Sequence, residues 1–204
     1  MKYLIIFVII IITIIYINTD YKNNHICQLK GNNIITIGDS IANGFGVDSN
    51  DSFAIKTAEL LNKNPIKMGI NGETSIQLLA RIDKTLSSIN NIAAIFISIG
   101  GNDFLRNIDS NITESNLDKI VANAKKYTNC IVLLGVPSSI SSSILGNVSP
   151  IYNNVSKKYN ILVESKSMVE ILKNRNLKVD QIHPNKAGHN IIANNIATLI
   201  KNNK

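Results

Sequence analysis

A serine, an aspartate and a histidine in this chain have the residue types of an acyl-transfer triad, although they lie far apart in the sequence. Ser40 follows a Gly-Asp pair, whereas Asp180 and His183 lie near the C-terminus. A serine hydroxyl is a weak nucleophile until a base takes its proton, and a histidine oriented by a carboxylate is the usual base. We therefore predict Ser40 as nucleophile, His183 as base and Asp180 as the group that orients His183.

Three groups in the sequence can donate hydrogen bonds to the oxyanion that such an attack creates. Two are the backbone N–H groups of Ser40 and Gly72, and the missing side chain of Gly72 lets a substrate approach closely. The third is the side-chain amide of Asn102, in a Gly-Gly-Asn-Asp segment. Loss of one such donor costs about 2.7–4 kcal/mol of transition-state stabilisation. We predict an oxyanion hole formed by Ser40, Gly72 and Asn102.

The sequence around the predicted base favours a fixed position for its side chain. Asp180 lies three residues before His183, so in a helix-like turn both side chains face the same way. Pro184 biases His183 toward an extended backbone and suits the first position of a following helix. We therefore expect the pair in the loop that precedes the last helix.

The elements that must position these residues are visible as apolar runs of strand length that alternate with helical patterns. The expected strands cover residues 33–37, 66–70, 93–99, 130–136 and 161–163. The expected helices cover residues 53–62, a segment from 74 onward, 115–127, 151–158, 166–173, and a last helix with Ile191, Ile192, Ile196 and Ile200. This alternation predicts an α/β fold, with a parallel sheet between two layers of helices. Ligands bind beyond the carboxyl ends of such strands, and Ser40, Gly72 and Asn102 each follow an expected strand.

The helix that begins near residue 74 has distinct local signals. Thr74 and Gln77 have the spacing of a capping box, in which each side chain satisfies an N–H group at the helix start. One helical face carries four apolar residues, Ile76, Leu79, Ile82 and Leu86. We predict that this face packs against the sheet.

The N-terminus has the composition of a targeting segment. The apolar run at residues 3–17 is interrupted only by Thr13, and its length falls between a signal-peptide core and a spanning helix. No small-x-small cleavage site follows, so we predict an uncleaved signal-anchor at 1–19, with a cleaved signal peptide as the alternative. Residues 20–32 are expected to be a polar linker, and 33–204 a single extracytoplasmic domain, periplasmic or at the cell surface. The anchor would tether it to the inner membrane; the cleaved form would be secreted.

Charge and cysteine usage exclude several function classes. The net charge is +7, but the lysines are scattered and no basic run is interleaved with aromatic residues, so no nucleic-acid partner is expected. The only cysteines are Cys27 and Cys130, and without a C-x-x-C motif a zinc ribbon is unsupported. Because Cys27 falls in the expected linker and Cys130 at a buried strand, we expect two unpaired thiols, with a disulfide as the alternative.

Four segments together resemble the sequence blocks of the SGNH, or GDSL, hydrolase family. They contain Gly-Asp-Ser at 38–40, Gly72, Gly-Gly-Asn-Asp at 100–103, and Asp180 with His183. Within that family the chain is most similar to the small bacterial thioesterase, arylesterase and lysophospholipase group, over residues 33–200. The resemblance implies the triad and oxyanion hole named above, a five-stranded sheet of flavodoxin-like order, and no metal or organic cofactor.

The resemblance also extends to a substrate-binding segment and shows three departures. It implies that Phe104 and Leu105, followed by Arg106, line an acyl site. The departures are Ile41 in place of the usual Leu, Lys67 in place of Asn, and Gln181 in place of Gly. None of them removes a catalytic group, although Lys67 and Gln181 leave local hydrogen bonding open.

The remaining titratable residues near these segments have simpler interpretations. We expect His189 to be a packing or surface residue of the last helix and His25 to be solvated in the linker. Asp39 and Asp103 are expected to form structural hydrogen bonds in their loops.

Three functions remain in consideration from the sequence. The first is hydrolysis of acyl thioesters, aryl esters or lysophospholipids through an acyl-enzyme, with the membrane contacted through the N-terminal segment. The second keeps this chemistry but removes O-acetyl groups from an envelope glycan. The third is an anchored binding protein on an inactive hydrolase fold, and the intact set of predicted catalytic residues argues against it.

Overall fold

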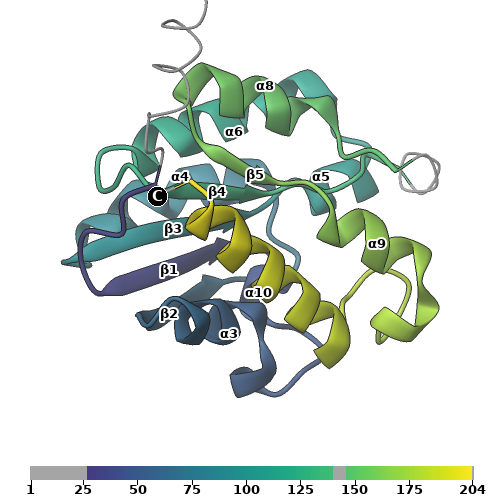
Figure 1. Cartoon of the computed structure of the whole chain (residues 1–204). Coiled ribbons are helices and arrows are strands. Elements are labelled where there is room, and N and C mark those ends of the chain that lie inside the picture. The colour runs from purple at the N-terminus through teal and green to yellow at the C-terminus, as the bar shows by residue number, and fades with distance from the viewer. Residues whose placement is uncertain (1–26, 140–145, 204) are drawn as a thin grey trace, which may run out of the picture.

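A computed structural model describes residues 27–139 and 146–203 of the chain (Figure 1). The predicted signal-anchor at 1–19, His25 and the middle of the Ser-rich segment lie outside the described residues. Over the described ranges, no helix combines the length and the apolar character that a bilayer crossing requires.

A parallel β-sheet forms the centre of the described chain. Its strands are β1 (Asn33–Gly38), β2 (Asn64–Gly69), β3 (Ile92–Ser98), β4 (Ile131–Leu134) and β5 (Leu162–Glu164). The strand order is β2-β1-β3-β4-β5, with every neighbouring pair parallel. In register, Ile35 of β1 pairs with Ile66 on one side and Ile95 on the other. This confirms the predicted five-stranded sheet of flavodoxin-like order.

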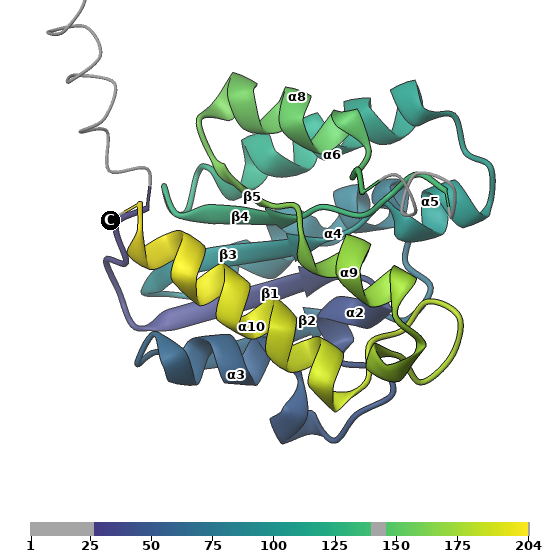
Figure 2. The same cartoon turned by 45° about the vertical axis from the view of Figure 1, so that its right-hand side comes forward.

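Helices cover both faces of the sheet. The described helices are α2 (Ser40–Asn43), α3 (Phe53–Leu60), α4 (Ser75–Ser87), α5 (Gly101–Leu105), α6 (Ser110–Ala124), α8 (Pro150–Tyr159), α9 (Ser167–Lys173) and α10 (Lys186–Lys201), with 3-10 turns η1 (Ser49–Asp51) and η2 (Arg175–Leu177). In the packing, α6 contacts both α4 and α8, whereas α10 contacts α3. Figures 1 and 2 show α6 and α8 over one face and α3 and α10 over the other. The three-layer architecture predicted from the sequence is therefore confirmed.

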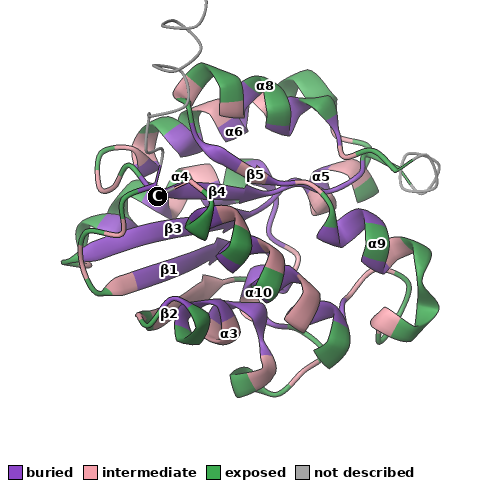
Figure 3. Cartoon of the chain, viewed as in Figure 1, coloured by how far each residue is buried: buried purple, intermediate pink, exposed green. Residues whose placement is uncertain are grey.

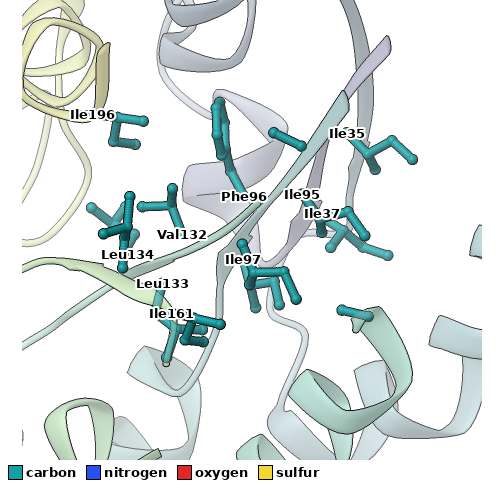
Figure 4. Packing of buried hydrophobic residues seen from close by; sticks show 14 of the residues in the cluster. Ile35, Ile37, Ile95, Phe96, Ile97, Val132, Leu133, Leu134, Ile161 and Ile196 are labelled. Carbon is teal, nitrogen blue, oxygen red and sulfur yellow. The ribbon is translucent and has the colours of Figure 1, made fainter. Parts of the chain in front are cut away.

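The core lies along the central strands. β3 is buried at every position, as a strand with helices on both faces requires. Figure 3 shows the buried residues concentrated in the sheet and the exposed ones on the outer sides of the helices. The labelled core side chains in Figure 4 come from β1, β3 and β4, with Ile161 and Ile196 from the surrounding segments.

Two of the predicted helices differ in detail from the structure. The helix expected at 115–127 begins at Ser110, because the Asp109 side chain accepts a hydrogen bond from the Asn111 N–H and caps the helix start. The capping box of α4 is present as predicted. However, Ile76 is 58% exposed and Leu78 takes its expected place in the core, because the buried face of α4 is rotated from the predicted one and consists of Ser75, Leu78, Ile82 and Leu86.

The expectation of two unpaired thiols is wrong, because Cys27 and Cys130 form a disulfide with Cα atoms 4.2 Å apart. Cys27 is fully buried instead of lying in a solvated linker, and its N–H donates to the Asn203 carbonyl at 3.3 Å. The sequence did not show that the chain before β1 returns to the start of β4 and the end of α10. Both ends of the described chain therefore lie at the amino edge of the sheet.

Candidate active site

Ser40, His183 and Asp180 meet at the carboxyl edge of the sheet, where the sequence placed them. Ser40 Oγ lies 2.9 Å from His183 Nε2, across 143 positions of sequence. His183 Nδ1 lies 2.7 Å from Asp180 Oδ2. Because an ionised carboxylate only accepts hydrogen bonds, Nδ1 carries the proton and Nε2 is free to accept one from the serine hydroxyl.

A tight turn, and not the expected helix-like turn, makes Asp180 and His183 face each other. The Val179 N–H donates to the His183 carbonyl at 3.0 Å and closes the turn. Inside it, Asp180 Oδ1 accepts hydrogen bonds from the N–H groups of Ile182 at 2.9 Å and His183 at 2.8 Å. The carboxylate therefore holds the turn with one oxygen and the imidazole with the other.

These hydrogen bonds also keep Asp180 ionised. Partial burial acts to raise the pKa of the carboxyl group, but hydrogen bonds from the His183 backbone and ring and from the Ile182 N–H outweigh it. The pKa of Asp180 falls to about 2. Pro184 is not the first residue of α10 as predicted: it pairs with Lys178 in an antiparallel bridge, and Asn185 caps the helix instead.

The position of Ser40, the predicted nucleophile, follows from the end of β1. A Cβ atom on Gly38, where φ is +134°, would lie only 1.8 Å from the Ser98 carbonyl oxygen, so only glycine fits there. Asp39 Oδ1 then accepts from the Ile41 N–H and the Ser98 hydroxyl, both at 3.0 Å. Burial raises the pKa of Asp39 to about 6 against these hydrogen bonds. The structural role predicted for Asp39 is confirmed.

A clamp of hydrogen bonds fixes the loop that carries Gly72. Arg81 donates to Glu73 Oε2 at 2.7 Å and to the Met68 carbonyl at 2.8 Å, which joins the loop to α4 and β2. The Asn102 amide donates to the Glu73 carbonyl at 3.0 Å, which fixes its orientation and leaves its second N–H available. The loop between β2 and α4 is therefore tied directly to the start of α5.

The residues after Asn102 have different environments. Asp103 is fully buried, and one of its oxygens accepts from the Ser75 N–H at 2.9 Å, which confirms its predicted structural role. Phe104 is half-buried and packs against the core, whereas Leu105 is 59% exposed. Arg106 donates to the Gly72 carbonyl at 2.9 Å. Of the two residues expected to bind substrate, only Leu105 presents most of its side chain to solvent.

Sequence reasoning missed Phe45, whose ring contacts the predicted base. The centroids of the Phe45 and His183 rings are 4.5 Å apart, and the Phe45 N–H donates to the Ser40 carbonyl at 2.9 Å. Phe45 thus connects the serine turn with the imidazole. The sequence signal that could have identified it is an aromatic residue between two glycines, Gly44 and Gly46. In the structure both glycines adopt positive φ.

His189 supports the same region from behind. Its ring is fully buried, stacks on Phe53 with centroids 6.0 Å apart, and accepts the Phe53 N–H on Nδ1 at 3.2 Å. Burial lowers the pKa of His189 to about 4, against a hydrogen bond to the Phe45 backbone that acts to raise it. The predicted packing role is confirmed.

The lowered pKa predicts a pH-dependent loss of stability that belongs to His189. An unfolded histidine titrates near 6.5, so the folded state binds fewer protons than the unfolded state between about pH 6.5 and 4. The contribution is complete above pH 6.5, and about 3 kcal/mol is lost as pH falls to 4. In His189→Asn, whose Oδ1 can still accept the Phe53 N–H, this loss should be absent. Urea unfolding of both proteins from pH 4 to 7 measures this difference. Asp39 contributes to the pH dependence in the opposite direction, but equally in both proteins, so its contribution cancels. If the free energies of unfolding of the two proteins changed in parallel with pH, the assignment to His189 would be wrong.

A family profile and a bacterial enzyme each match most of this chain. The profile of the GDSL-like lipase/acylhydrolase family matches residues 36–191. Thioesterase 1/protease 1/lysophospholipase L1 of Escherichia coli strain K12 is 26% identical over 171 residues, which cover 78% of this chain and 79% of that protein.

Solved structures share the fold. The psychrotrophic esterase EstA from Pseudoalteromonas sp. superposes with a TM-score of 0.70 at 22% identity, over 83% of this chain and 97% of EstA. A catalytic mutant of Axe2, an acetylxylan esterase from Geobacillus stearothermophilus, gives 0.68 at 21% identity, over 84% of this chain and 94% of Axe2.

Proposed function

The chain belongs to the GDSL-like lipase/acylhydrolase family and is an ester hydrolase, and we propose that it acts through an acyl-enzyme on Ser40, with His183 as base and Asp180 as its orienting group. The observation that carries this proposal is the continuous contact from Ser40 Oγ to His183 Nε2 at 2.9 Å and from Nδ1 to Asp180 at 2.7 Å. The first distance lies within hydrogen-bond reach for a nucleophile and its base, and the second lies within reach for a base and its orienting carboxylate.

The proposed reaction has two halves. Ser40 Oγ attacks the carbonyl carbon of the ester while its proton passes to His183 Nε2. The N–H groups of Ser40 and Gly72 and the amide of Asn102 donate to the resulting oxyanion. Collapse of the intermediate breaks the bond to the alcohol, which takes the proton from His183. Water then attacks the acyl carbon while its proton passes to His183 Nε2. Collapse of this second intermediate breaks the bond to Ser40 Oγ, which takes the proton from His183, and the acid is released.

For the substrate, we favour lipid-like acyl esters, such as lysophospholipids and aryl or medium-chain esters, with thioesters of the same acyl groups as chemical equivalents. The E. coli relative is described as a thioesterase and a lysophospholipase. Exposed Leu105 and Ile70 offer apolar surface near the predicted oxyanion hole. The segment around Leu105 is therefore the proposed acyl-binding side.

We also propose that the domain works outside the cytoplasm, held by the N-terminal segment at 1–19. Two features support this proposal: the apolar run at residues 3–17 and the disulfide between Cys27 and Cys130, since disulfides persist in oxidising compartments. Such a location favours lipid or envelope esters over acyl-CoA.

One observation favours the second candidate function, removal of O-acetyl groups from a glycan. A hollow of about 530 Å³ is lined by Gly46, Val47, Asp48, Asp51 and Lys186. Gly46 on its wall directly follows Phe45, whose ring contacts His183, so the hollow lies next to a loop that reaches the proposed base. Its polar lining suits a sugar hydroxyl better than an aryl group.

A panel of esters decides between these candidates. The full chain is assayed on p-nitrophenyl acetate, p-nitrophenyl octanoate, lysophosphatidylcholine, an octanoyl thioester and acetylated xylan. We expect kcat/KM for octanoate to exceed that for acetate by at least about tenfold, because additional methylenes are buried at the acyl site. A reversed preference, with acetylated xylan as the best substrate, would favour the glycan esterase. If the chain hydrolysed none of these esters, the result would favour the third function, a binding protein on an inactive hydrolase fold.

A further inference from the structure

The exposed large hydrophobic side chains are unevenly distributed over the described residues. Six of the seven lie at the carboxyl edge of the sheet, in the loops after α2 and β2, in the first turns of α4 and α6, at the last residue of α5 and in the turn before α10: Phe45, Ile70, Ile76, Leu105, Ile112 and Val179. We call these six the apolar rim. The seventh, Leu60, is the last residue of α3 and lies at the opposite edge. The catalytic edge is therefore the apolar one.

Hydrogen bonds show that one half of the rim is continuous. The start of α4 is joined to the second turn of α6, where Asn116 Nδ2 donates to Ser75 Oγ at 2.9 Å, next to Ile76 in the chain and one turn beyond Ile112. Ser75 in turn donates to Asp103 of α5. Ile76 and Ile112 therefore project from adjoining helix starts, beside the short helix that ends at Leu105 (Figure 2).

The other half of the rim lies on the far side of the serine. A Cβ atom on Gly46 would lie 2.7 Å from the Val179 side chain, so the loop after Phe45 contacts the turn that carries Asp180 and His183. The Phe45 ring packs on His183 and is still 42% exposed. Apolar side chains therefore flank the opening to Ser40 on both sides.

We propose that the apolar rim docks the enzyme on an anionic lipid surface, so that ester substrates reach Ser40 directly from that surface. This inference rests on the proposed function and specifies how its lipid-like substrate is presented. Exposed apolar groups gathered in one region mark an interaction site, and here they surround the point where the substrate must arrive. Arg106, exposed between Leu105 and the Gly72 loop, places a cation on this rim that can pair with anionic headgroups.

The absence of tryptophan from the chain provides a direct test. Single-tryptophan variants Ile112→Trp and Leu60→Trp place a reporter at the rim and at the opposite edge, on side chains of similar exposure, 53% and 43%. Each full-length variant is mixed with vesicles of phosphatidylcholine alone or with phosphatidylglycerol, with and without brominated acyl chains. We expect Ile112→Trp to shift its emission to shorter wavelength and lose most of its intensity to bromine, more so with phosphatidylglycerol, and Leu60→Trp to do neither.

The N-terminal segment joins the domain at Cys27, at the amino edge, so lipid contact through that segment alone would bring Leu60→Trp, and not Ile112→Trp, toward the vesicle. Equal quenching at both positions, or quenching at Leu60→Trp alone, overturns the proposal. A kinetic test uses the double variant Ile76→Ser with Ile112→Ser. We expect its kcat/KM on a vesicle-dispersed ester to fall at least about tenfold, with p-nitrophenyl acetate unchanged and Leu60→Ser unaffected on both.

The two proposals fail in different ways. If the wild type does not hydrolyse p-nitrophenyl acetate, the proposed catalytic function is wrong, and the fluorescence experiment still reports on docking. If p-nitrophenyl acetate is hydrolysed and the rim reporter stays in water, only the docking proposal is wrong.

Discussion

Ser40→Ala is expected to lower kcat by about 10⁶-fold, since removal of the nucleophile from another serine hydrolase has an effect of that size. Alanine retains the backbone N–H but has no oxygen to attack the ester. The fold should persist, because within the described residues the Ser40 hydroxyl forms a hydrogen bond with His183 alone, whereas Asp39 holds the turn. The measurement is turnover of p-nitrophenyl octanoate together with the thermal unfolding midpoint.

Ser88→Ala is the matched control, because Ser88 caps the end of α4 that lies opposite the predicted site, and its hydroxyl donates locally to the Thr85 carbonyl at 2.8 Å. It should retain wild-type activity. Turnover near the wild-type rate in a folded Ser40→Ala protein would mean that another group, or an activated water, attacks the ester.

Asp180→Asn should lower kcat by about 10⁴-fold, as in triads where the histidine adopts the wrong tautomer. The asparagine Oδ1 can still accept the N–H groups of Ile182 and His183, so the turn should remain closed. Its amide NH₂, however, would face Nδ1 and donate to it, which moves the ring proton to Nε2. With its proton on Nε2, His183 cannot accept the proton of Ser40.

The pKa of about 2 adds a pH test for the same residue. This value is below the unfolded value of 3.8, so the stability that Asp180 contributes is present above pH 3.8 and is lost as pH falls through 2. Ionisation of Asp180 should therefore leave no step in the kcat profile above pH 4. Asp83→Asn, at an aspartate of α4 whose side chain is 58% exposed, serves as control. Wild-type rates in Asp180→Asn would show that a different group orients the base.

The strands and helices could be predicted because their sequence signals are local. β3 is an uninterrupted apolar run of strand length, and α4 begins at a capping box that two residues define. Ser40, Gly72 and Asn102 could be placed together because the carboxyl ends of parallel strands share one edge. The meeting of Ser40 with His183 depended on the resemblance to a family as well, since no periodicity relates residues 143 positions apart.

The features that were missed depend on tertiary contacts. The disulfide joins Cys27 to Cys130 because the chain before β1 packs between the start of β4 and the end of α10. No local sequence pattern encodes this contact. Phe45 lacks any spacing that relates it to His183, and its role appears only when the two turns meet. Ile76 fits a helical spacing, but the face of α4 that packs on the core runs through Leu78, Ile82 and Leu86 instead. Two apolar spacings overlap in this helix, and periodicity alone does not show which of them contacts the core.

Mass spectrometry after reaction with a fluorophosphonate tests the central claim most directly, because the reagent forms a stable bond with an activated serine. The account predicts one adduct per chain on the peptide that contains Ser40, and strongly reduced labelling in Asp180→Asn. An unlabelled folded protein, or an adduct on a different serine with Ser40 unmodified, would contradict it.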